Sequence, residues 1–187
     1  MPSGQTGQGK PRERITKIDA ARRQLKTAIR LFFQGGDAVS THTLAHAIQE
    51  LLRGLLKTKG GGSFIKDSDW IKPEYYKEYL EILNAPGNFF KHADLDPDEV
   101  LEFNSENTTF VLLDCAKMYY EFTGRALREC RVFGIWYALE YPHHVKPGLL
   151  AEHIKEVREV SGGAQISKDF FLTMIDRADI FPMQDCD

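Results

Sequence analysis

The 187-residue sequence is poor in features that mark exported, metal-stapled or membrane proteins. It has only three cysteines and no CxxC pair, so zinc ribbons and disulfide frameworks, which need closely spaced thiols, are not expected: Cys115, Cys130 and Cys186. It lacks a run of about 18 apolar residues, the length that spans a bilayer. Its first ten residues have no apolar segment like that of a secretory signal. These absences predict a soluble, cytoplasmic protein with reduced thiols and no membrane association.

The sequence also has no overall excess of basic residues, because its formal net charge is −3. A protein that coats nucleic acid is usually basic overall. The charges are nevertheless uneven: residues 1–33 carry eight basic and two acidic side chains, and residues 94–114 carry seven acidic and no basic ones. This pattern fits a local binding surface for phosphates or a protein partner, and it equally fits ordinary solvated faces.

Apolar residues at helical spacing predict a helix from Ile15 to Phe33 that ends at Gly35-Gly36. Its polar side carries a basic stripe of Arg23, Lys26 and Arg30. Gly, Pro and capping residues predict the further helices. The next helix is capped by Ser40 and stops at Gly60-Gly61-Gly62, another runs from Pro73 to about Leu83, and a short one is capped by Asn88 after a break at Pro86-Gly87. A buried helix from Ser105 to Thr123 ends at Gly124, and three more are predicted over Arg125–Tyr141, Leu149–Val160 and Lys168–Ala178.

The expected fold is therefore all-α, since no segment alternates apolar and polar residues as hairpin strands do. The organisation that we predict is a flexible tail over residues 1–14, an up-and-down helical bundle over residues 15–124, and a C-terminal helical extension over residues 125–187 that packs on the bundle.

Two motifs look like ligand loops and are better explained otherwise. Residues 4–10 match the GxxxxGK of a phosphate-binding loop, but Pro11 takes the Ser/Thr position and only three residues precede the loop, too few for the strand it needs. Asp94, Asp96 and Asp98 resemble the start of a calcium loop, which needs Gly at its sixth position and Glu at its twelfth. Here Glu99 and Ser105 stand at those positions, so the acids are interpreted as helix caps.

A third pattern consists of His42, His46 and Glu50, spaced four residues apart on one helix face. Two histidines one turn apart can share a metal ion, but no HExxH motif is present. We interpret this pattern as a polar helix face and expect no metal and no cofactor. A metal enzyme centred on the three residues stays as an alternative.

The most informative polar pair is Asn88 and His92, four residues apart and so on one face of the short helix predicted there. Such a pair can contact a phosphate or act on a proton. It can equally be a helix cap and an ordinary surface histidine.

The order of elements from Ile15 to Gly124 resembles the HEPN domain family of small helical bundles. The helix DAVSTHTLAHAIQELLRGLLKTKG, with Glu50, is similar to an early helix of the family that carries a buried acidic residue. The segment NAPGNFFKHADLDPDEV is similar to the family signature, an Arg followed four to six residues later by His. The helix from Ser105 to Gly124 is similar to the closing helix.

The resemblance implies a function, because many HEPN proteins are metal-independent ribonucleases in which the Arg and His meet across a dimer. His92 matches the His that handles the proton of a ribose 2′-hydroxyl, and Asn88 matches the polar residue after the Arg. The Arg position falls on Gly87, and losing a catalytic cation typically lowers the rate about a hundredfold or more. Lys91 is next to His92 in the sequence but lies about 100° round a helix from it, so the two side chains are on different faces and Lys91 is no evident replacement for the Arg.

The resemblance therefore predicts a homodimer, in a setting of bacterial stress or defence, that binds RNA or a nucleotide and is inactive or weakly active as a ribonuclease. The residues expected to bind are Asn88, Lys91, His92, Glu50, Arg23, Lys26 and Arg30, with His92 as the one candidate catalytic residue. The alternative is a dimeric regulatory or scaffold module whose acidic segment, residues 94–114, binds a basic protein partner.

Overall fold

The computed structural model describes residues 12–94, 97–146, 151–160 and 166–177, and over these residues it is all-helical, as predicted. Seven α-helices and two 3₁₀ turns follow one another along the chain: α1 (Lys17–Phe33), α2 (Ala38–Lys57), η1 (Pro73–Tyr75), α3 (Tyr76–Phe89), α4 (Asn107–Thr123), α5 (Arg128–Glu140), η2 (Pro142–His144), α6 (Ala151–Val160) and α7 (Lys168–Asp176). No helix in these ranges is both long and apolar enough to cross a bilayer.

Local capping sets most of the helix ends. Thr16 and Asp19 form a capping box at the start of α1, where each side chain binds the other residue's backbone N–H. The start of α2 differs from the prediction: Asp37 is the cap, and its carboxylate accepts a hydrogen bond from the N–H of Ser40. Gly124 ends α4 in the left-handed conformation, as predicted.

Helix α3 departs most from the sequence prediction, because it runs through Pro86 and Gly87 instead of breaking there. The predicted short helix capped by Asn88 does not exist; Asn88 lies in the last turn of α3. Proline removes one helical N–H donor, but the next turn still closes through the bond from the N–H of Phe90 to the carbonyl of Pro86 (3.1 Å).

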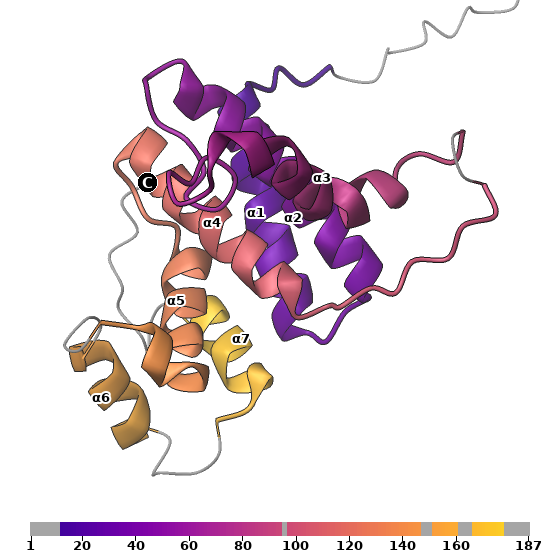
Figure 1. The fold of residues 1–187 in the computed structure, drawn as a ribbon. Helices are drawn as coiled ribbons and strands as arrows, with labels where there is room; N and C mark the ends of the chain where they lie inside the picture. The colour runs from indigo at the N-terminus through magenta and orange to yellow at the C-terminus, as the bar shows by residue number, and fades with distance from the viewer. Residues whose placement is uncertain (1–11, 95–96, 147–150, 161–165, 178–187) are drawn as a thin grey trace, which may run out of the picture.

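Helix α2 lies at the centre of the bundle, with α1 and α4 packed along it and α3 on a third side (Figure 1). Contacts between α2 and α4 join their N-terminal ends through His42 and Thr108, and their middles through Gln49 and Asp114, so these two helices run parallel. Helix α3 contacts α2 but neither α1 nor α4, so the up-and-down arrangement is open on the α3 side.

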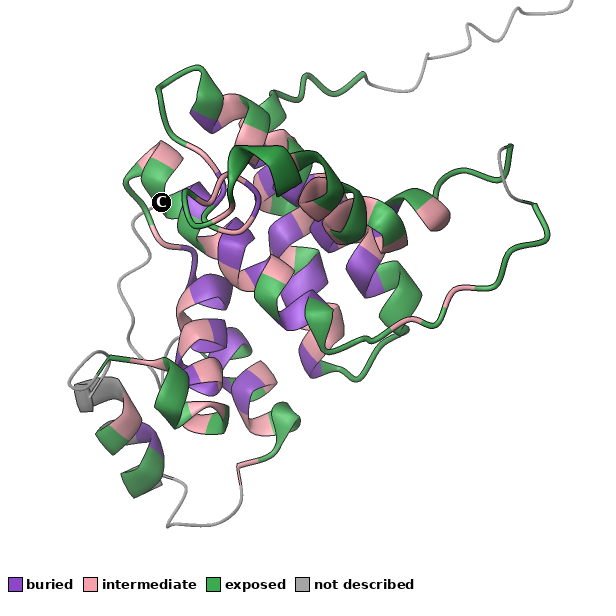
Figure 2. Ribbon diagram, viewed as in Figure 1, coloured by how far each residue is buried: buried purple, intermediate pink, exposed green. Residues whose placement is uncertain are grey.

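One hydrophobic core extends from α1 through α2 and α4 into α5, α6 and α7. Phe33 at the end of α1 joins the two parts, because its ring contacts those of Phe133, Trp136 and Phe171. Figure 2 shows the buried residues gathered on the inner helices, whereas α3 is mostly exposed or intermediate. Within α3 only Gly87 is buried.

Candidate functional site

The interface between α2 and α3 is built around a buried lysine. Lys66, on the segment between these helices, is 1% exposed, and its ammonium donates to Oε1 of Glu50 (2.5 Å) and to Oδ1 of Asn84 (2.6 Å). Burial lowers the pKa of Lys66, and Glu50 opposes that effect. Burial also disfavours the charged form of Glu50, but the hydrogen bond and charge of Lys66 prevail and lower the pKa of Glu50. Glu50, predicted as a binding residue, is thus bound to the protein's own cation.

His46 extends this polar network to the end of α3. Its Nε2 lies 3.3 Å from Oδ1 of Asn84, and its Nδ1 lies 3.1 Å from Nζ of Lys91. Burial and the nearby Lys66 and Lys91 ammonium groups lower the pKa of His46 to about 4, so the ring is neutral at pH 7. These partners assign the tautomer: Nε2–H donates to Asn84, and Nδ1 accepts from Lys91.

Gly87 packs directly against the His46 ring. A Cβ atom at position 87 would lie 2.3 Å from ring carbons of His46, far inside van der Waals contact. The position at which the HEPN signature has its Arg therefore has no room for any side chain in this arrangement. The same contact explains why α3 continues through Pro86-Gly87: the glycine lets α3 approach α2 closely.

His42, one turn before His46, anchors the segment that follows α3. Its Nδ1 is 3.0 Å from the hydroxyl of Thr108, and the edges of Phe90 and Phe103 pack around the ring at 5.9 and 5.0 Å between centroids. Its Nε2 is buried without a hydrogen-bond partner among the described residues. Burial lowers the pKa of His42 to about 4. Both histidines are thus neutral and structural.

The predicted Asn88–His92 pair lies at the exposed end of this network. His92 follows the end of α3, but its N–H still donates to the carbonyl of Asn88 (3.0 Å), which keeps the four-residue relationship. Both side chains are exposed, and neither forms a hydrogen bond with any residue that the structure describes. Lys91 is exposed too, apart from its contact with His46.

The basic stripe lies on a different face of the molecule. Arg23 pairs with Glu13, Lys26 approaches the buried Glu129 (3.7 Å), and Arg30 contacts both Glu129 (3.4 Å) and Asp176 (2.6 Å). Helix α2 separates α1 from α3, so the stripe does not join Asn88 and His92. The structure therefore brings Glu50 and Lys91 into one network and leaves Asn88 and His92 at its edge. It places Lys26 and Arg30 of the stripe against α5 and α7, and Arg23 against Glu13.

A second buried carboxylate escaped the sequence analysis. Asp114 on α4 is fully buried and accepts hydrogen bonds from Gln49 (2.7 Å), the Ser63 hydroxyl (2.5 Å) and the N–H of Phe64 (3.0 Å). Burial raises the pKa of Asp114, and these donors limit the rise. The contacts fasten the Ser63–Lys66 segment between α2 and α4. No sequence pattern marks them, because the donors are 50 or more residues away.

Metal-binding clusters of three or more His, Cys, Asp or Glu side chains are not found in the described ranges. His42 and His46 lie 6.5 Å apart between ring centroids and are bound to Thr108, Asn84 and Lys91, while Glu50 is bound to Lys66. Of the acids that resemble a calcium loop, Asp94 and Asp98 are exposed, and Asp96 lies outside the described residues. The GxxxxGK segment and Cys186 lie outside them too, whereas Cys115 and Cys130 are free and buried.

Comparison with known proteins gives no match, because no family model, no curated protein sequence and no solved structure is significantly similar to this chain.

Proposed function

We propose that this chain is a HEPN-like protein that binds single-stranded RNA through Asn88, Lys91 and His92 at the exposed end of α3. The observation that carries the proposal is the contact between Nζ of Lys91 and Nδ1 of the buried His46 (3.1 Å). It holds a cation at the same end of α3 as Asn88 and His92, two exposed side chains that form no hydrogen bond with the described residues. An ammonium can pair with a phosphate, and an amide and an imidazole can bind base edges or a ribose hydroxyl.

The geometry supports binding in preference to cleavage. The family's catalytic Arg has no room at Gly87, and the ammonium of Lys91 is directed to His46. The guanidinium that the family uses to neutralise the charge on a phosphate during cleavage is therefore missing, and the single ammonium of Lys91, shared with His46, does not replace it. The proposed protein therefore holds RNA without rapid turnover.

The acidic residues after His92 restrict how RNA can bind. Asp94 and Asp98 are exposed on the segment that follows α3, and they would repel phosphates along that direction. The proposed contact therefore involves about one phosphate. For single strands, the logarithm of the binding constant decreases by about 0.7 per phosphate contact for each tenfold rise in salt concentration. With about one phosphate contact, the affinity should therefore depend only weakly on salt.

Fluorescence anisotropy with a labelled single-stranded RNA tests the proposal on the full chain. His92→Ala and Lys91→Gln should each weaken binding about fivefold, the loss expected for one hydrogen bond or phosphate contact. Lys77→Gln is the matched control, because Lys77 is an exposed lysine near the other end of α3, and its affinity should equal that of the wild type. Absence of binding by the wild type, or equal binding by all four proteins, would remove the proposal.

A second candidate function, a dimeric scaffold that binds protein, is favoured by the outer face of α3. Three large apolar side chains on and just before α3 are exposed: Trp70 (94%), Tyr75 at the end of η1 (57%) and Ile82 on α3 (66%). Exposed apolar side chains on one stretch of chain are candidates for an interaction surface. We propose that a second copy of the chain covers this face, with or without RNA at the end of α3.

Light scattering after size-exclusion chromatography tests the dimer. The wild type should elute as a dimer and Ile82→Lys as a monomer with an unchanged circular dichroism spectrum, because Ile82 is exposed in the single chain. A monomeric wild type would exclude the dimer. If the dimer forms but RNA does not bind, pull-down with wild type and with Asp94→Asn/Asp98→Asn decides whether the acidic segment recruits a basic protein.

A further inference from the structure

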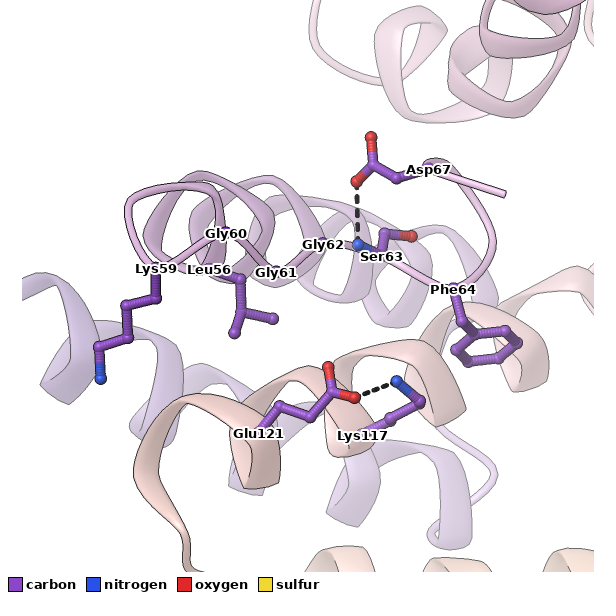
Figure 3. Close-up of a pocket in the computed structure, with 10 residues that line it drawn as sticks. All are labelled: Leu56, Lys59, Gly60, Gly61, Gly62, Ser63, Phe64, Asp67, Lys117 and Glu121. Carbon is purple, nitrogen blue, oxygen red and sulfur yellow. Dashed lines mark hydrogen bonds and ion pairs between the residues drawn. The ribbon is translucent and has the colours of Figure 1, made fainter. Parts of the chain in front are cut away.

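A groove of about 550 Å³ lies beyond the C-terminal end of α2. It is remote from His42, which is in the first half of α2, and from Lys91, which follows the end of α3. This volume lies within the range of small-molecule pockets, about 300–1,000 Å³. One wall is the glycine segment Gly60–Phe64 and the other is the second half of α4 (Figure 3). Neither the proposed RNA contacts nor the dimer face uses it.

The three glycines of this wall, Gly60–Gly62, are fixed in place and present backbone to the groove. Gly60 has φ of 78°, a left-handed conformation that favours glycine, and the N–H of Gly61 donates to the carbonyl of Leu56 (3.0 Å). A Cβ atom on Gly62 would lie 2.7 Å from Oδ2 of Asp67, so only glycine lets that carboxylate approach the backbone. Arg53 in turn binds Asp67 through two nitrogens and holds the pKa of that carboxyl well below its usual range.

Three different chemical groups follow one another along the groove, from the end of the glycine wall, from α4 and from the turn before Gly60. The Phe64 ring, 47% exposed, lies at one end, 6.0 Å from Nζ of Lys117. Glu121, one turn further along α4 and paired with Lys117, points toward the glycine wall (Figure 3). Lys59 lies at the far end, where its ammonium is 4.0 Å from the centroid of the Phe122 ring and donates to the carbonyl of Phe122 (3.1 Å).

The positions of these groups match one kind of ligand. The Phe64 ring and the Lys59 ammonium lie at opposite ends of the groove, with Glu121 between them (Figure 3). The fixed ammonium of Lys59 has N–H donors left after its bond to Phe122. Two cations, Lys59 and Lys117, and two carboxylates, Asp67 and Glu121, line the groove. Lys117 is paired with Glu121, and Asp67 is paired with Arg53 and Lys57, so Lys59 is the lining cation that has no carboxylate partner among the described residues.

We propose that this groove binds a small molecule with an aromatic ring and an anionic group: the ring stacks on Phe64, a central donor group binds Glu121, and the anionic group pairs with Lys59. Two sources share this chemistry. A nucleoside monophosphate has a base, ribose hydroxyls and a phosphate in this order, and an aromatic amino acid has a ring, an ammonium and a carboxylate. The exposed backbone of the glycine wall allows either molecule to lie flat in the groove.

Calorimetric titration of the full chain with AMP, adenosine and L-tryptophan tests the proposal and separates the two sources. Saturable binding of AMP or of tryptophan is expected, and Lys59→Gln should weaken it at least fivefold by removing the anion's partner. Phe64→Leu, which keeps apolar cover but loses the flat ring, should weaken it similarly. Adenosine lacks the anionic group, so any binding of it should be insensitive to Lys59→Gln.

Controls keep this result separate from the RNA proposal. Lys77→Gln and His92→Ala should leave the binding of AMP or tryptophan unchanged, and Lys59→Gln should leave RNA binding unchanged. Because Lys59 and Phe64 lie at the surface, circular dichroism should show folded variants; independently, amide NMR shifts of wild type should change at Gly60–Gly62 and Glu121. The proposal would be overturned if neither AMP nor tryptophan bound, if Lys59→Gln and Phe64→Leu both left the affinity unchanged, or if the NMR shift changes were centred on His92.

Discussion

The helices that pack on α1 and the helix that packs on α2 are held in contrasting ways. On the α1 side, α5 and α7 pack through apolar rings such as Phe133 and Phe171, and Lys26 and Arg30 of α1 are paired with Glu129 and Asp176. On the α2 side, α3 buries only Gly87 and is held by polar contacts of Asn84 and Lys91. The charges on the α1 side are therefore used within the fold, whereas those near the end of α3 are partly available.

This difference bears on where function can lie. Apolar packing is non-directional and survives modest changes, but a buried polar network depends on each of its partners. A helix held by such a network has low local stability and is a suitable place for a binding site. The comparison therefore favours the α3 side for binding and assigns the α1 side to stability.

The largest expected effect that tests this comparison is the response of the α3 side to acid. His42 and His46 have pKa values of about 4 in the folded protein against 6.5 when unfolded. The unfolded chain thus binds protons first, so stability is fully present above pH 6.5, falls as the pH drops toward 4, and levels off below it. Between pH 7.5 and 5 the loss should be about 2 kcal/mol for each ring.

Urea unfolding at these two pH values measures the loss. His46→Gln should reduce the loss of stability between pH 7.5 and pH 5 by about half. His92→Ala, which alters an exposed histidine, should leave that loss unchanged. Hydrogen exchange should show α3 losing protection before α1. A free energy of unfolding that stays constant down to pH 5 would mean that the histidines are not buried as neutral rings, and the contrast between the two sides would weaken.

Sequence periodicity is sufficient to predict α1: Ala21, Leu25, Ala28 and Ile29 are among the apolar residues at helical spacing between Ile15 and Phe33, and all four are fully buried. Such patterns are local, so they can be found without knowledge of the fold. The polar network could not be predicted in this way. Lys66 reads as an ordinary loop lysine, and its partners Glu50 and Asn84 are 16 and 18 residues away, brought together only by the return of α3 onto α2.

Pro86-Gly87 shows the same limit for helix boundaries. The local rule for these two residues predicts a break, but the close contact of Gly87 with His46 stabilises a continuous α3. Likewise, Arg23, Lys26 and Arg30 were correctly placed on one helix, but their acidic partners could not be foreseen, because Glu129 and Asp176 come from helices about 100 residues or more further along the chain.

The next effect in size concerns this close contact. Gly87→Ala should push α3 away from α2 and cost about 2 kcal/mol, as overpacking in a tight interface typically does. Gly54→Ala is the matched control, since Gly54 is also helical but has open space around its Cβ direction, and alanine should stabilise α2 by about 1 kcal/mol. Thermal unfolding compares the two variants. A Gly87→Ala protein as stable as the wild type would show that α3 can shift on α2 without loss.

The smallest expected effect lies on the α1 side and completes the comparison. Arg30→Gln removes contacts with Asp176, which is half-exposed, and with Glu129, which keeps Lys26 as a partner. Because exposed ion pairs contribute little, the free energy of unfolding should fall by less than about 1 kcal/mol, measured against Asp176→Asn and the double variant. RNA affinity should not change, because the guanidinium is already bound within the fold. If RNA binding falls instead while stability holds, the cations of α1 are available to phosphates, and binding would not be confined to the α3 side.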